Sequence, residues 1–290
     1  MRRRSSLDAE TFGSTSSDRL DPAEPESLRR LLREYGIEAK QGRGQHWLCN
    51  PALADDIVAS ALPARSFLEI GPGLGPITSR LVGLGPVVAV EVDPELAQVV
   101  RRTAPGAEVV VGDALEVDLR TLLAPLPLPR AVVSNLPYNL TTRLLERFCA
   151  VSDAFDFAVV MMQREAGSRL FAKPGQSARG YLAALLDITF TVRGTTRVGR
   201  SNFVPQPTVD SVVYALAVEL PPTPDIQTLL KAAFLHPRRT LLSNLVTGGV
   251  PRADALDAVN ETGLSPTARA HQVSRSDWLR LAGRLHTRMS

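Results

Sequence analysis

The sequence is poor in cysteine and lysine and has no long hydrophobic run, and each shortage excludes a class of protein. Its two cysteines, Cys49 and Cys149, lie far apart in 290 residues, which excludes a disulfide framework and predicts no metal site. No apolar stretch reaches the ~18 residues that a membrane-spanning helix needs. The basic start at residues 1–6 is not followed by an apolar stretch, so we expect no secretory signal and a cytoplasmic location.

Basic charge comes almost entirely from arginine, because Lys40, Lys173 and Lys231 are the only lysines in a chain of net charge +3. Arginine presents a planar fork of N–H donors that matches phosphate groups and stacks on bases. Residues 221–290 hold nine basic against five acidic side chains and are therefore more basic than the chain as a whole. This balance permits a nucleic-acid partner and makes the tail the expected phosphate-contacting face.

Three parts of the chain differ in composition and in the spacing of apolar residues. Residues 1–26 are rich in serine, proline and charged residues and are predicted to be a disordered extension. Residues 27–220 alternate short apolar runs with helical patterns, which is typical of a parallel sheet covered on both faces. Residues 221–290 begin with a proline-rich linker and then show helical spacing. The expected fold is α/β, a doubly wound Rossmann-like sheet with a small all-helical C-terminal domain.

Apolar runs and capping residues predict where the individual elements lie. Strands are expected at residues 67–70, 86–92, 108–111, 130–134 and 155–162, with two further strands at 188–192 and 208–218 as a hairpin at the sheet edge. Helices are expected at 27–35, after Asn50-Pro51, at 77–84, 94–102, 142–148 and 164–172, and in the tail at 229–235, 240–246, 253–259 and 278–285. The carboxyl ends of parallel strands meet at one edge of the sheet, where α/β proteins bind ligands.

Three successive strand ends carry residues suited to an adenosyl cofactor. The first strand ends in a glycine-rich loop, Gly71-Pro72-Gly73-Leu74-Gly75, which lets backbone N–H groups approach a ligand. Glu91 ends the second strand, where an acid can accept both ribose hydroxyls, and Asp113 ends the third, where it can accept an adenine amine. A glycine loop with one acid fits NAD equally well, so Asp113 and Asn135 at later strand ends are what favour a cofactor with a transferable methyl group.

The fourth strand ends in Asn135-Leu136-Pro137-Tyr138, which suits a flat, amino-bearing ring. Asn135 and the carbonyl of Leu136 can accept hydrogen bonds from an exocyclic amine, and Tyr138 can stack on the ring face. Pro137 fixes the backbone on which these groups converge. Taken alone, the tetrapeptide is more often a strand-ending turn, and its place beside the cofactor residues is what gives it a functional interpretation.

Six motifs together resemble the ribosomal RNA adenine dimethyltransferase family, and the resemblance runs from about Leu28 to the C-terminus. It implies a methyltransferase fold and S-adenosyl-L-methionine as the cofactor. The family has a small-subunit branch (KsgA-like) and a macrolide-resistance branch (Erm), and the long helical tail favours the first. The motifs lie at residues 44–48, 69–75, 91–93, 112–115, 135–139 and 203–211.

Carried over position by position, the resemblance implies a role for each motif. The target adenine would lie between Tyr138 and Phe203, with Asn135 and Leu136 holding its amine. No metal is implied. Contacts to S-adenosylmethionine would fall on Gln45, His46, Leu48, Gly71, Gly73, Glu91, Val92, Asp113, Ala114 and Asn135. RNA contacts would fall on Arg43, Arg179, Arg238 and Arg239.

The sequence departs from the family pattern at a few positions. His46-Trp47 stands where the family usually has Asn-Phe, which bears on the side-chain contact at His46. Thr240 stands where a lysine usually follows the arginine pair, and Arg269-Ala270-His271 replaces a familiar Arg-Ala-Glu. The last two departures bear on the RNA contacts of the tail.

The prediction is an enzyme that transfers methyl groups from S-adenosylmethionine to the N6 amines of two adjacent adenosines. The expected substrate is a loop near the 3′ end of small-subunit (16S) rRNA, methylated during ribosome biogenesis by a monomer bound to a 30S assembly intermediate. A large-subunit methylase of the macrolide-resistance type is the alternative within the class. A non-catalytic ribosome assembly factor that keeps the cofactor fold is the alternative from another class. An NAD dehydrogenase is disfavoured, since no residue set for hydride transfer follows the glycine loop.

Overall fold

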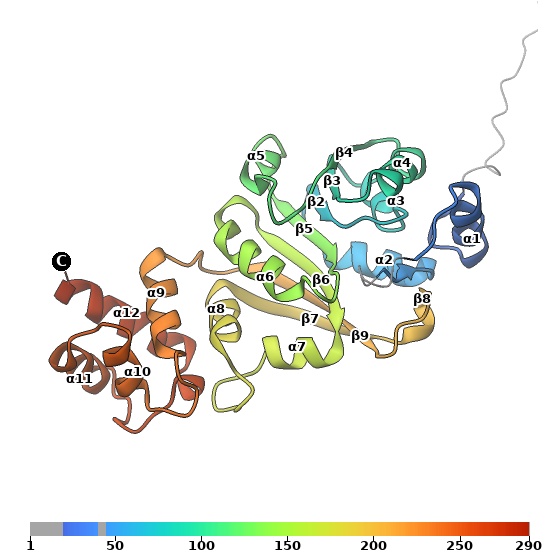
Figure 1. Cartoon of the computed structure of the whole chain (residues 1–290). Helices are drawn as coiled ribbons and strands as arrows, with labels where there is room; N and C mark the ends of the chain where they lie inside the picture. Colours follow the sequence, from blue (N-terminus) through green and yellow to red (C-terminus); the bar gives the residue numbers. More distant parts are fainter. Residues whose placement is uncertain (1–19, 40–44, 290) are drawn as a thin grey trace, which may run out of the picture.

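A seven-stranded sheet forms the centre of the computed structural model, which describes residues 20–39 and 45–289 (Figure 1). The strand order is β4-β3-β2-β5-β6-β9-β7. The first five strands pair in parallel, whereas β9 and β7 pair antiparallel at one edge. The strands are β2 (Ser66–Ile70), β3 (Val87–Glu91), β4 (Ala107–Val111), β5 (Arg130–Asn135), β6 (Phe157–Gln163), β7 (Phe190–Val198) and β9 (Ser211–Val218).

Helices cover both faces of this sheet, because side chains on alternate strand positions are apolar on either side. Leu68, Ile70, Val88 and Val132 pack toward α6 and α8, whereas Phe67, Val87, Ala131 and Val133 pack toward α2 and α3. The helices between the strands are α2 (Pro51–Ser60), α3 (Thr78–Leu81), α4 (Pro94–Thr103), α5 (Leu119–Leu123), α6 (Thr141–Ala150), α7 (Arg164–Leu170) and α8 (Tyr181–Thr189). Short 3₁₀ turns lie at Ser152–Ala154, Arg200–Asn202 and Ala270–Gln272.

The expected α/β architecture is confirmed, but one strand was placed wrongly. Residues 188–192 were expected to be extended, whereas α8 continues to Thr189 and β7 begins at Phe190. Nearly every residue of α8 is buried, so its apolar run has no exposed face that would reveal a helical period. The predicted edge hairpin itself is confirmed, since β7 and β9 pair antiparallel at the end of the sheet.

A two-stranded ribbon lies apart from the main sheet and joins two distant segments. It pairs β1 (Trp47–Leu48) with β8 (Phe203–Val204), so that Leu48 lies opposite Phe203. The N–H of Cys49 extends the pairing by donating to the carbonyl of Asn202 at 2.8 Å. Residues 45–48 are thereby held near the carboxyl ends of the parallel strands.

The N-terminal boundary expected at residue 26 is wrong by several residues. Ala23 is fully buried, and helix α1 (Pro25–Glu34) starts two residues later. The guanidinium of Arg80 donates to both carboxylate oxygens of Asp21, at 3.0 and 2.8 Å. Leu28 and Leu31 of α1 pack against Trp47, Leu74 and other side chains behind the glycine loop. Residues 1–19, the rest of the predicted extension, lie outside the described residues.

All four helices expected in the tail are present and gather around the fully buried Trp278. They are α9 (Pro224–Ala233), α10 (Leu241–Thr247), α11 (Arg252–Glu261) and α12 (Arg275–Met289). Helices α9 and α12 contact α8, and one hydrophobic cluster runs from the sheet through α8 into the tail. Figure 1 shows the tail at the end of the molecule opposite α1. Within the described residues, no helix is both long enough and apolar enough to cross a membrane.

Candidate active site

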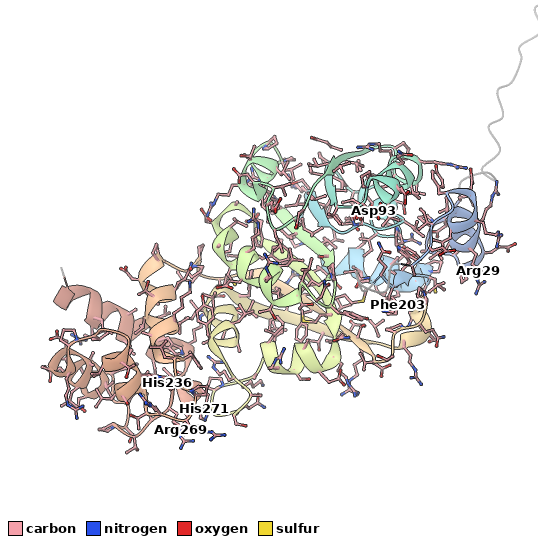
Figure 2. All side chains as sticks on the ribbon, viewed as in Figure 1. Arg29, Asp93, Phe203, His236, Arg269 and His271 are labelled. Carbon is pink, nitrogen blue, oxygen red and sulfur yellow. The ribbon has the colours of Figure 1, made fainter. Side chains whose placement is uncertain are left out.

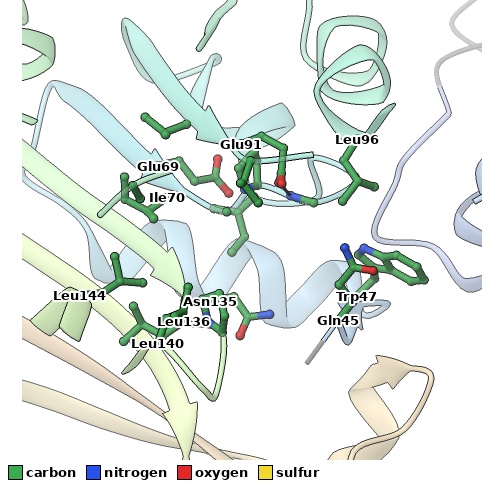
Figure 3. Close-up of a pocket in the computed structure, with 18 of the residues that line it drawn as sticks. Gln45, Trp47, Glu69, Ile70, Glu91, Leu96, Asn135, Leu136, Leu140 and Leu144 are labelled. Carbon is green, nitrogen blue, oxygen red and sulfur yellow. Dashed lines mark hydrogen bonds between the residues drawn. The ribbon is translucent and has the colours of Figure 1, made fainter. Parts of the chain in front are cut away.

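A cavity of about 290 Å³ opens at the carboxyl ends of β2, β3 and β5 (Figure 3). The chain order reverses between β2 and β5, and α/β proteins bind ligands outside such a point. Every residue expected to contact the cofactor lines this one cavity: Gln45, His46, Leu48, Gly71, Gly73, Glu91, Val92, Asp113, Ala114 and Asn135. The sequence motifs, dispersed over ninety positions of the chain, therefore come together as predicted.

Glu91 joins the end of β3 to the glycine loop. Its carboxylate accepts a hydrogen bond from the N–H of Gly73 at 3.1 Å and another from the N–H of Asp93 at 3.0 Å. The side chain is 5% exposed, and this burial raises the pKa of its carboxyl, while the two backbone donors act in the opposite direction. Glu91 thus has a fixed orientation at the wall where an acid for ribose hydroxyls was expected.

Glu69 lines the same cavity and was missed as a site residue, although it begins the glycine-loop motif at residues 69–75. Its side chain is 2% exposed, and Oε2 has no hydrogen-bond partner among the described residues. Burial raises the pKa of this carboxyl to about 8, and the charge of nearby Glu91 adds to the effect. A buried acid beside a cavity is stabilised in its charged form by a cationic ligand group. S-adenosylmethionine carries both an ammonium and a sulfonium, so this donor set fits it.

The turn after β4 forms another wall of the cavity. Asp113 is half-buried, and its Oδ1 accepts a hydrogen bond from the N–H of Leu115 at 2.8 Å. Arg147 on α6 secures the same turn, since its guanidinium donates to the carbonyls of Leu115 and Val117. Nothing in the motif reasoning singled out Arg147, because its partners are main-chain atoms thirty residues earlier.

The segment after β5 lies across the mouth of the cavity. Asn135 is the last residue of the strand, and its Nδ2 donates to the carbonyl of His46 at 3.4 Å. The N–H of Leu136 donates to the carbonyl of Met161 at 2.9 Å, which continues the pairing with β6. Tyr138 is half-buried with its hydroxyl 3.4 Å from that of Ser211, and burial raises its pKa. Asn135, Leu136 and Tyr138 all line the cavity, as expected.

Phe203 does not lie where it was expected. It is 1% exposed, packs in the cluster that includes Leu48 and Ile57, and does not line the cavity. Pairing of β8 with β1 turns its ring into the core instead of leaving it in an exposed loop. The expectation that this ring faces Tyr138 is therefore wrong for this structure.

The four arginines expected to contact RNA have different surroundings. Arg238 and Arg239 are exposed in the turn between α9 and α10. Arg179 is 3% exposed, donates to the carbonyl of Ala172 at 3.0 Å and pairs with Asp187 at 2.8 Å. Its guanidinium is used to hold the α7–α8 loop, so its assignment to RNA is wrong for this structure. Arg43 lies outside the described residues.

The fold and the cavity together define a Rossmann-like methyltransferase that uses S-adenosylmethionine. The sequence model of the protein family described as ribosomal RNA adenine dimethylase matches residues 36–287 of this chain. The chain therefore belongs to the ribosomal RNA adenine dimethylase family. This confirms the predicted family, fold class and enzyme class, an S-adenosylmethionine-dependent rRNA adenine dimethyltransferase.

Curated relatives agree with this assignment, and solved structures share the fold. Ribosomal RNA small subunit methyltransferase A of Thermobifida fusca is 34% identical over 286 residues, which cover 92% of this chain and 98% of the relative. The protein of that name in Synechococcus sp. is 37% identical over 257 residues, covering 82% and 90%. A dimethyladenosine transferase from Plasmodium falciparum shares the fold, with a TM-score of 0.68 at 24% identity, covering 81% of this chain and 96% of that one. The 23S rRNA methyltransferase ErmE has a TM-score of 0.63 at 25% identity, covering 83% and 99%.

Proposed function

We propose that the enzyme methylates the N6 amines of two adjacent adenosines in a loop near the 3′ end of small-subunit rRNA. The observation that carries this proposal is the position of Asn135-Leu136-Pro137-Tyr138 at the mouth of the cofactor cavity. Relatives named as small-subunit methyltransferases, similar over nearly the whole chain, support the choice of subunit. The bound cofactor supplies an electrophilic methyl group, so the protein needs mainly to position and polarise the amine.

The hydrogen bonds of Asn135 leave it well arranged for that task. Its Nδ2 is already directed at the carbonyl of His46, so Oδ1 is the atom that remains to accept from an amine proton. The carbonyl of Leu136 accepts the second amine proton. Two acceptors draw the amine lone pair away from the ring and towards the methyl donor, which is electrostatic preorganisation. Tyr138 stacks on the base, which must leave its own stack to reach the site.

The RNA-contacting surface would extend from the cavity to the tail. The α7–α8 loop and the tail are joined, since the N–H of Gly175 donates to the carbonyl of His271 at 2.9 Å. The turn that carries Arg238 and Arg239 is joined to the same region by a bond from the N–H of Leu241 to the carbonyl of Ala268 at 2.7 Å. Figure 2 shows Arg269 in this part of the tail, near His236 and His271. Exposed arginines on connected turns suit a phosphate backbone.

The protein would act on an assembly intermediate of the small subunit, as a monomer in the cytoplasm. Its exposed arginines suit the phosphates of an RNA substrate, and the target bases are most easily extruded from a single-stranded loop. The intact cavity, with Glu91, Asp113 and Asn135 in place, favours a catalytic protein over an assembly factor without activity.

Transfer of radiolabelled methyl groups to undermethylated small and large subunits tests the proposal. We expect label in small subunits, on two adjacent adenosines, and a loss of roughly a hundredfold or more in Asn135→Ala. Asn260→Ala, at an exposed position on α11, is the matched control and should behave like the wild type. Label confined to large subunits would support the macrolide-resistance alternative, which the similarity to ErmE makes the second candidate. Equal transfer by Asn135→Ala would contradict the mechanism.

A further inference from the structure

Two aromatic rings face each other at the mouth of the cavity, and neither belongs to Phe203. The rings of His46 and Tyr138 both line the cavity, with centroids 5.5 Å apart and planes tilted by 30°. The ring of Phe203 is directed into the core instead. The aromatic surface opposite Tyr138 is therefore the imidazole of His46.

One segment, residues 203–211, holds both rings from its two ends. Nδ1 of His46 lies 2.8 Å from the carbonyl oxygen of Pro205, and because a carbonyl only accepts, Nδ1 must carry the proton and donate. The hydroxyl of Tyr138 lies 3.4 Å from that of Ser211. The main chain of His46 is also held, by the bond from Asn135. These contacts set the tautomer of His46 and hold the two rings in their present arrangement, without a base between them.

We propose that His46 is the second aromatic surface for the target base, so that the adenine stacks between His46 and Tyr138. This inference rests on the proposed function, because it takes the base to be an adenine of RNA. In this arrangement Phe203 does not contact the base. Residues 203–211 contribute indirectly, because Pro205 positions the ring of His46 and Ser211 positions that of Tyr138. His46 touches the substrate, whereas Pro205 and Ser211 are positioning residues.

The present spacing also shows what the base must do on entry. A base stacked between two rings needs about 7 Å between those rings, because each of the two stacking contacts spans roughly 3.5 Å. The centroids are 5.5 Å apart, so the rings as they stand leave no room for a base between them. The base therefore displaces the ring of His46 outward and lengthens its hydrogen bond to Pro205.

Substitution of His46 separates a contact with the base from a contact with the cofactor. Three variants are needed: His46→Ala removes the ring, His46→Phe keeps a flat ring without the Nδ1 donor, and His46→Asn keeps a polar side chain without an aromatic ring. Steady-state methyl transfer gives KM for the ribosomal subunit, and calorimetry gives the Kd for S-adenosylmethionine. The substrate in every assay is whichever subunit the wild-type enzyme methylates.

We expect His46→Ala to raise KM for the subunit about tenfold while the cofactor Kd stays within about twofold, since stacking on one base contributes at about this level. His46→Phe should recover most of the loss, and His46→Asn should resemble His46→Ala. The inference is overturned if KM is unchanged in His46→Ala, if the cofactor Kd rises as much as KM, or if the phenylalanine fails to restore KM. A wild-type enzyme that labels only large subunits overturns the choice of subunit and leaves this test of His46 intact.

Discussion

Gly75 and Thr103 approach each other so closely that a β-carbon added to Gly75 would lie 2.5 Å from Oγ1 of Thr103. That hydroxyl lies 3.0 Å from the carbonyl oxygen of Leu74 and 3.1 Å from that of Val99, so it is held by acceptors on both the loop and its own helix. Helix α4, which carries Thr103, thereby packs against the last two residues of the glycine loop, Leu74 and Gly75. Gly71, at the start of the same loop, has no atom within 4 Å of the corresponding position.

Alanine substitutions at these two glycines should differ in their effect on stability. Both positions have a positive φ, 70° at Gly71 and 83° at Gly75, so each substitution costs about 1–2 kcal/mol of backbone strain. Gly75→Ala adds an overlap with Thr103, which raises its cost by a further 1–3 kcal/mol or so. Urea unfolding of the two variants measures the difference. Combining Gly75→Ala with Thr103→Ala should remove the excess, and an undiminished excess in that double variant would contradict the explanation.

The raised pKa of Glu69 predicts how the stability of the cofactor-free protein depends on pH. Between pH 4.5 and about 8 the unfolded chain releases the proton of this carboxyl, while the folded protein keeps it. The folded state then binds more protons, so the free energy of unfolding falls as pH rises through this window. Glu69→Gln removes this fall in the free energy of unfolding. The melting temperature of the variant, minus that of the wild type, should therefore increase from pH 5 to pH 8.

The exposed Glu108 on β4 provides the control for this measurement. Glu108→Gln should keep a nearly constant difference in melting temperature from the wild type across the same range, because its carboxyl reaches water in both states. A constant difference for Glu69→Gln as well would mean that the buried carboxyl is ionised throughout. Saturating S-adenosylmethionine should reduce the pH dependence, since a cationic ligand favours the carboxylate.

The features that could be predicted from the sequence are those with local causes. The helix after Asn50 was expected because asparagine followed by proline caps a first turn, and Oδ1 of Asn50 accepts from the N–H of Leu53 at 3.2 Å. The parallel strands were expected from short apolar runs, and the cofactor residues from the strand ends. Since parallel strands end at one edge, sequence order alone was enough to bring Gly71, Glu91 and Asn135 into one cavity.

The features that could not be predicted depend on contacts that the regular spacing of a helix or strand does not show. The burial of Phe203 follows from its pairing with Leu48, more than 150 positions away, while its neighbouring prolines are typical of an exposed loop. Arg179 occupies a glycine-bearing basic loop, and its bonds to Asp187 on α8 and to the carbonyl of Ala172 show that it is structural. Asp21 lies in a stretch of low hydrophobicity and is ordered by Arg80. No local pattern carries this information.

Arg147 should control cofactor affinity without touching the cofactor cavity directly. Its guanidinium donates to the carbonyls of Leu115 and Val117 and so fixes the turn that carries Asp113 and Ala114. Arg147→Ala leaves both carbonyls without this donor, and we expect the Kd for S-adenosylmethionine to rise by roughly 5–20-fold, or 1–2 kcal/mol. Calorimetric titration measures it. Arg143→Ala, at an exposed position one turn earlier on α6, is the control, and an equal loss there would contradict the assignment.

The arginines of the tail and the α7–α8 loop should separate RNA binding from stability. Arg179→Ala breaks a buried ion pair and should lower the free energy of unfolding by roughly 2 kcal/mol, less than for a fully buried pair because Asp187 is 37% exposed. Arg238→Ala and Arg239→Ala, at exposed positions, should leave stability unchanged.

Their effect should appear in the salt dependence of binding to the small subunit. Each exposed arginine that contacts a phosphate contributes about one unit to the slope of log K against log salt, so the double variant Arg238→Ala/Arg239→Ala should lower that slope by about two. Arg179→Ala should keep the wild-type slope at temperatures where it is folded. Binding measured between 50 and 200 mM salt, together with urea unfolding, separates the two roles. A wild-type slope in the double variant would remove this turn from the RNA-contacting surface, because the lost charges would then have no phosphate to neutralise.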